Sequence, residues 1–165
     1  MFRKIFAAGL LFAMLGGHAN SAVPEGTVIP VQTVDHLAHW VEQAMHVSMD
    51  VTPVVIVSDS KLRRALRVDD VQRAGAAAAY LPGRIVIGQN VWDENSLKSQ
   101  SYLVHELVHH AQLVSGRHYP CHAAKEREAY MFQNAWLDEQ GLAPAVSVAW
   151  VDRMAACPAK DKDQD

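Results

Sequence analysis

Five consecutive residues of this chain have the types and spacing of a zinc site: His105, Glu106, Leu107, Val108 and His109. In the pattern H-E-x-x-H, two histidines bind Zn²⁺ and the glutamate between them acts as general base. An α-helix turns about 100° per residue, so residues i and i+4 lie on one face, about one turn apart. Both imidazoles can then reach one ion. The predicted chemistry is hydrolysis by a zinc-bound water that Glu106 activates.

This geometry requires a helix, and the residues around the motif predict one from Leu97 to Val114. Its apolar side chains cover nearly the whole circumference, which is typical of a helix buried in the middle of a domain. Asn95 or Ser96 can cap the first turn, and Gly116 can end the helix. Burying two histidines and a glutamate is costly unless they bind an ion or are hydrogen-bonded. The alternative is that both histidines are core residues satisfied by backbone groups.

Catalytic zinc sites usually have three protein ligands, so the motif needs a third. The metzincin pattern would place Gly at position 112 and His at 115, but the chain has Gln112 and Ser115, which excludes that class. A second helix is predicted from Ala123 to Gln140, and it carries two glutamates close together, Glu126 and Glu128. One of them can face back toward the histidine pair.

The two predicted helices resemble those of the gluzincin-type metallopeptidases. These proteins carry H-E-x-x-H on one helix and a ligand glutamate on a following helix, often within the pattern E-x-x-A-D. Residues 126–129 of this chain are Glu-Arg-Glu-Ala, and Tyr130 stands in place of the Asp. An Asp there would orient a ligand histidine by hydrogen bonding, whereas a Tyr can do something similar or face the substrate. The resemblance covers about residues 97–140.

The resemblance implies both a site and a fold. It implies one Zn²⁺ ion bound by His105, His109 and Glu126, with Glu106 as general base. The implied fold is α+β and zincin-like, with a small β-sheet or hairpin packed on the buried H-E-x-x-H helix and further helices. In such folds an extended peptide pairs with the free edge of a strand before that helix, here predicted at residues 84–89. The implied partner is a peptide or protein substrate.

The remaining elements are predicted from hydrophobic periodicity and turn residues. The predicted helices lie at 34–45, 61–68 and 144–156, and the predicted strands at 52–57, 75–80 and 84–87. The alanine run within 75–80 could equally be helical. The last two strands form a hairpin around a Pro-Gly turn at residues 82–83.

The first 22 residues have the organisation of a secretory signal peptide: a basic start, an apolar run at residues 5–15, and small residues up to Ala22. The mature chain is then a single domain at residues 23–158, followed by a charged tail at 159–165 that we expect to be disordered. The sequence therefore predicts an exported protein, periplasmic or secreted, with no stable membrane anchor after cleavage.

The chain has two cysteines, Cys121 and Cys157, and in an exported protein such a pair usually forms a disulfide. The alternative, Cys121 as a metal ligand, is disfavoured in an oxidising compartment. The net charge of the full chain is −3, and loss of Arg3 and Lys4 with the signal peptide leaves 13 basic against 18 acidic residues. This acidic balance argues against a nucleic-acid partner.

Together these features predict a secreted or periplasmic zinc-dependent hydrolase, with a peptidase as the preferred activity. One alternative is a metal-binding or interaction domain on a zincin scaffold, without turnover, and another is a plain structural domain with no metal. A peptidase also needs a group that stabilises the oxyanion. The candidates near the motif are His118, Tyr119, His122 and Tyr130, and the sequence does not distinguish among them.

Overall fold

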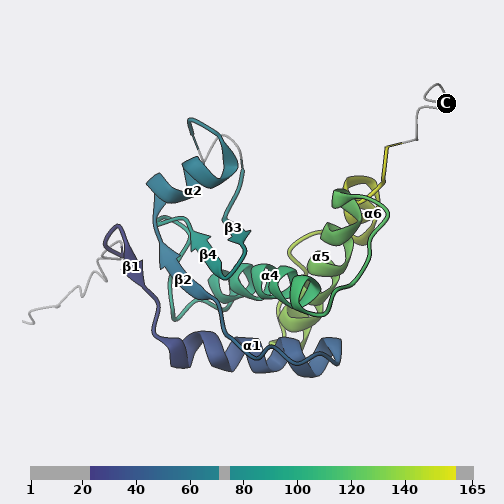
Figure 1. Ribbon diagram of the computed structural model, residues 1–165, viewed down its shortest axis with the longest axis horizontal. Coiled ribbons are helices and arrows are strands. Elements are labelled where there is room, and N and C mark those ends of the chain that lie inside the picture. Colours follow the sequence, from purple (N-terminus) through teal and green to yellow (C-terminus); the bar gives the residue numbers. More distant parts are fainter. Residues whose placement is uncertain (1–22, 71–74, 159–165) are drawn as a thin grey trace, which may run out of the picture.

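The computed structural model describes residues 23–70 and 75–158 of the chain (Figure 1). Within these ranges it contains five helices and one four-stranded sheet, which confirms the predicted α+β class. The predicted signal peptide at 1–22 and the predicted tail at 159–165 lie outside the described residues. In the part of the chain that is described, no helix has both the length and the apolar composition to cross a membrane.

The elements follow one another in mixed order. They are β1 (Thr27–Val28), α1 (Val31–Met45), β2 (Val54–Val57), α2 (Asp59–Leu66), β3 (Ala78–Leu81), β4 (Arg84–Ile87), α4 (Leu97–Val114), α5 (His122–Glu139) and α6 (Val148–Met154). Each helix and strand predicted from the sequence corresponds to one of these. The H-E-x-x-H helix, α4, begins and ends at the predicted residues.

The sheet has the strand order β1-β2-β4-β3. Strand β4 pairs in parallel with β2 and antiparallel with β3, so both of its edges are occupied. The prediction that residues 84–89 offer a free edge is therefore wrong. The run Ile85–Ile87 is almost fully buried on both faces, as expected for a central strand, and this leaves the other arm of the hairpin, β3, at the edge.

Helix α4 lies at the centre of the main hydrophobic core, between the sheet and helices α1 and α5 (Figure 1). Five of its apolar side chains have no solvent exposure: Leu103, Val104, Leu107, Val108 and Ala111. Helix α2 covers the opposite face of the sheet, where Leu62 packs against Val86. Because α4 is packed on several sides, the motif it carries is held on a rigid element.

Local signals fix both ends of α4. Ser96, rather than Asn95, caps the first turn by accepting a hydrogen bond from the Ser99 N–H at 3.3 Å. At the other end Gly116 adopts φ = 63°, a left-handed conformation that glycine takes without strain, and its N–H donates to the Leu113 carbonyl at 3.1 Å. The chain then leaves α4 and turns back to begin α5.

The predicted disulfide between Cys121 and Cys157 is present. It joins the residue before α5 to the segment after α6, so that α5 and α6 are held together at this end. Arg127 of α5 and Asp152 of α6 add an ion pair with a separation of 3.0 Å. Since Cys121 is oxidised, the alternative in which it binds a metal does not hold.

Candidate metal centre

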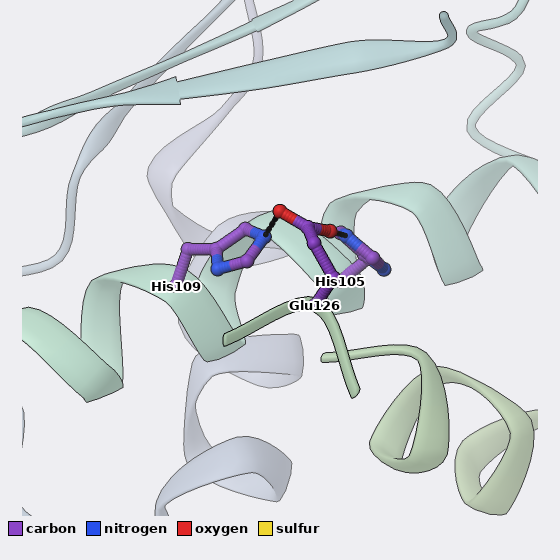
Figure 2. Close-up of side chains that lie close together, drawn as sticks. All are labelled: His105, His109 and Glu126. Carbon is purple, nitrogen blue, oxygen red and sulfur yellow. Dashed lines mark hydrogen bonds and ion pairs between the residues drawn. The ribbon is translucent and has the colours of Figure 1, made fainter. Parts of the chain in front are cut away.

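The structure brings together the three residues that were predicted as metal ligands (Figure 2). His105 and His109 project from α4, one turn apart, and Glu126 projects toward them from α5. The distance from His105 Nε2 to Glu126 Oε2 is 3.2 Å, and that from His109 Nε2 to Glu126 Oε1 is 3.3 Å. Each carboxylate oxygen therefore faces one imidazole.

The second glutamate of α5, Glu128, faces elsewhere. Two residues correspond to about 200° around a helix, so Glu126 and Glu128 cannot both face the histidines. Glu128 instead accepts hydrogen bonds from Arg117 and from the Tyr119 hydroxyl, and a third from the Gln112 amide at 3.0 Å. The geometry thus selects Glu126 as the acidic member of the cluster.

The outer nitrogen of His105 is held by a chain of hydrogen bonds. His105 Nδ1 lies 3.2 Å from Gln133 Oε1, and Gln133 Nε2 donates to Ser101 Oγ at 3.1 Å. The Ser101 hydroxyl donates its own proton to the Lys98 carbonyl at 2.7 Å, so it can only accept from Gln133. This fixes the Gln133 amide with its oxygen toward His105. Consequently, His105 Nδ1 must donate.

A separate chain holds the outer nitrogen of His109. Its Nδ1 lies 2.9 Å from Gln112 Oε1. Gln112 Nε2 donates to the Lys125 carbonyl at 2.9 Å and to Glu128, and both of these groups only accept. The Gln112 oxygen must therefore face His109, whose Nδ1 donates. The two histidines are satisfied by side-chain amides rather than by the backbone groups that the alternative prediction required.

With both Nδ1 atoms donating outward, both Nε2 atoms turn their lone pairs toward the Glu126 carboxylate. Nitrogen lone pairs and carboxylate oxygens all attract positive charge, so the cluster requires a cation or protons between its members. Burial lowers the pKa of His109, but the hydrogen bond with Glu126 and the charges of Glu106 and Glu126 outweigh it and raise this pKa. A raised pKa favours the protonated imidazole, in which His109 Nε2 donates to Glu126.

The same arrangement fits Zn²⁺. Two imidazole nitrogens and a glutamate oxygen form the ligand set of one class of catalytic zinc site. The candidate ligand atoms of the three residues all lie within 4.8 Å of one another, close enough to share one ion. Metal-binding histidines almost always donate their other N–H to an oxygen, as both histidines do here. The residues present therefore suit the ion.

Glu106 is buried beside this cluster, with only 8% of its surface exposed. Burial raises the pKa of its carboxyl group, while the positive charges of His105 and His109 oppose the rise. The backbone of Tyr80, in strand β3, is a smaller influence that also opposes the rise in this pKa. Glu106 is thus close enough to both the histidine pair and the edge strand for each to shift its pKa, and it is not one of the three clustered groups.

Of the four candidates for oxyanion stabilisation, Tyr130 lies against a predicted ligand. Its ring centroid is 4.4 Å from that of His105, and on its other side it meets Trp150 of α6 at 5.1 Å. Burial and the nearby carboxylates raise the pKa of Tyr130, so its hydroxyl stays protonated and able to donate. Tyr119 is engaged by Glu128, and the remaining two, His118 and His122, are exposed.

The two glutamines were not predicted from the sequence as parts of the site. Gln133 lies seven residues after Glu126, which places both side chains on one face of α5. Gln112 lies three residues after His109 on α4. A polar residue recurring on the inward face of a helix was the signal that could have revealed each of them.

The comparisons with known proteins place the chain in a family. Residues 27–165 match a family that is described as a domain of unknown function, DUF6647. The chain belongs to this family. The DUF6647 match includes both helices of the candidate metal centre and both cysteines of the disulfide. No curated protein and no solved structure matches the chain.

Proposed function

We propose that this DUF6647 protein is an exported zinc-dependent hydrolase, with a peptidase as the preferred activity. His105, His109 and Glu126 would bind one Zn²⁺ ion, and Glu106 would act as general base. The observation that carries this proposal is the pair of hydrogen-bond chains through Gln133 and Gln112. They act independently, yet both direct an Nε2 lone pair to the same carboxylate. The resemblance to gluzincins, including a zincin-like fold, supports the proposal.

A bound Zn²⁺ would polarise the scissile carbonyl and make the attacking water more acidic. Glu106 would take a proton from that water and pass it to the leaving amine. A general base works best when its pKa lies near the working pH, and burial shifts the pKa of Glu106 in that direction. The hydroxyl of Tyr130, whose ring packs against His105, would donate a hydrogen bond to the oxygen that becomes negative.

The position of β3 supports a peptide as substrate. This strand, Ala78–Leu81, pairs with β4 on one side and forms the edge of the sheet on the other. It packs against α4, the helix that carries Glu106, and the Tyr80 backbone is close enough to that carboxyl group to lower its pKa. An extended peptide added to this edge would carry its own backbone past Glu106.

Two features support export. The disulfide between Cys121 and Cys157 is typical of oxidising compartments. The first 22 residues, outside the described part of the chain, have the composition of a signal peptide. The mature protein would then work in the periplasm or outside the cell.

Replacing Glu106 with Gln tests the proposed function. Glu106→Gln keeps the shape of the side chain but removes the base, so we expect hydrolysis of a broad peptide library to fall by roughly 10²–10⁴-fold. Elemental analysis should still find one zinc per chain. Glu94→Gln, at an exposed glutamate before α4, is the matched control and should behave as the parent.

Two results would contradict this proposal in different ways. Full activity of Glu106→Gln would show that Glu106 is not the base. A parent protein that binds zinc but cleaves no peptide would favour the alternative, a metal-binding or interaction domain without turnover. Less than about half an equivalent of zinc after gentle purification would argue against the metal centre itself.

A further inference from the structure

His110 follows the second ligand directly, but it points to a different part of the fold. Adjacent residues of a helix differ by about 100° in direction, so His110 turns away from the cluster that includes His109. It is 5% exposed. Its Nε2 lies 2.8 Å from the Val51 carbonyl, and its Nδ1 lies 3.0 Å from the Tyr80 hydroxyl. The ring centroids of Tyr80 and His110 are 5.7 Å apart.

The directions of these hydrogen bonds follow from the groups involved. A carbonyl only accepts, so His110 Nε2 carries a proton and donates to Val51. In the neutral ring Nδ1 is then an acceptor, and the Tyr80 hydroxyl donates to it. The same hydroxyl accepts a long hydrogen bond from the Gly83 N–H, at 3.4 Å. The chain of bonds joins the segment before β2, the helix α4 and the edge strand β3.

Tyr80 also lies at the point where β3 passes the proposed base. Strand β3 packs against α4, the helix that carries Glu106, and the Tyr80 side chain is hydrogen-bonded to His110 on that helix. Strand β3 has a partner strand on one side only. An edge strand is less restrained than a central one, so a side-chain bond to a buried helix limits its movement relative to that helix.

We propose that Tyr80 and His110 are positioning residues that hold the edge strand at a fixed place relative to Glu106. The inference rests on the proposed function, because it concerns the geometry at the same base. It adds that the hydroxyl–imidazole bond sets where a substrate backbone lies when it pairs with β3. Neither residue touches the metal cluster, so the bond acts on turnover rather than on metal binding.

Tyr80→Phe removes this bond while keeping the ring. Small misplacements of reacting groups lower rates by up to about 100-fold, so we expect kcat to fall by about tenfold. Zinc content should equal that of the parent, and KM should change less than kcat. Amide hydrogen exchange should become faster at residues 78–81. His110→Gln, which keeps one amide donor and one acceptor, should lower kcat less than His110→Leu does.

A double-mutant cycle tests whether the two residues act through their mutual bond. If they do, the variant with both Tyr80→Phe and His110→Leu loses no more activity than the worse single variant. Tyr102→Phe is the matched control, since Tyr102 is half-buried on α4 one turn before His105. We expect its kcat to equal that of the parent.

The other possible outcomes distinguish a failure of the positioning role from a failure of the proposed function. Parental kcat and exchange rates in Tyr80→Phe would overturn the positioning role while leaving the hydrolase intact. A loss of zinc in parallel with kcat would also overturn it, because the bond would then support the metal site. A parent without chelator-sensitive turnover would overturn both. If His110→Leu does not fold, Tyr80→Phe and His110→Gln still decide the matter.

Discussion

Replacing Gln133 with Leu is the most direct test of the hydrogen-bond chain behind His105. Gln133 is 1% exposed and connects His105 Nδ1 with the Ser101 hydroxyl. Leucine has a similar size and no polar atoms. The Ser101 hydroxyl would keep its bond to the Lys98 carbonyl, whereas the His105 N–H would have no acceptor in a buried position.

The size of the effect follows from these contacts. An unsatisfied buried donor costs about 1–3 kcal/mol, so we expect the free energy of unfolding of the metal-free protein to fall by about 2 kcal/mol. With Nδ1 no longer held, the ring can rotate and its proton can move to Nε2, which removes a ligand atom. Loss of such a supporting partner weakens metal binding by about 10–100-fold, or about 1.4–2.8 kcal/mol.

The assay is competition for zinc between the protein and a coloured chelator of known affinity. Gln43→Leu provides the control, because Gln43 also pairs with a histidine, His39, at 2.9 Å, but on the exposed surface of α1. We expect the Kd for zinc to rise in Gln133→Leu and to stay unchanged in Gln43→Leu. If the Kd of Gln133→Leu stayed within about twofold of the parent value, the argument from the fixed tautomer would be refuted.

Three further predictions concern the rest of the molecule. The disulfide spans 36 residues, so replacing Cys121 and Cys157 with Ser should lower the free energy of unfolding by about 4 kcal/mol in chemical denaturation. Hydrogen bonds from Ser58 and Ser60 lower the pKa of the exposed Glu25 to about 2, so its stabilising effect is present above pH 4.5 and is lost as the pH falls toward 2. Thermal melting of Glu25→Gln should therefore differ most from the parent near neutral pH, and the difference should shrink as the pH falls and vanish only below pH 2. Burial and the hydrogen bond to Glu128 raise the pKa of Tyr119 to about 12, so absorbance titration of Tyr119→Phe should lack the tyrosine that ionises at that pH.

The sequence predicted α4 and α5 well, because their signals are local. The apolar periodicity, the Ser96 cap and Gly116 lie within or beside the elements they define. The edge of the sheet was predicted wrongly, because either arm of a hairpin can be the central strand. That choice depends on pairing with β2, about thirty residues earlier in the chain.

The candidate site shows the same contrast between residues that the sequence predicts and residues that only the folded chain brings together. His105 and His109 were evident from their spacing, and Glu126 came from a resemblance to other proteins rather than from geometry. The amide chains through Gln112 and Gln133 depend on how α4 and α5 pack and on the rotamers that this packing allows. Tyr80 and His110 lie thirty residues apart, and only the folded chain brings them together.

The disulfide between Cys121 and Cys157 affects the order in which the residues of the candidate metal centre come together. Cys121 lies five residues before Glu126, on the segment that sets where α5 begins. A chain whose thiols are still reduced would hold its two histidines on α4, while the acidic member of the trio would be less firmly placed. Under the proposed function we therefore expect tight binding of zinc to follow oxidation, and an exported protein would reach its full affinity for zinc after leaving a reducing environment.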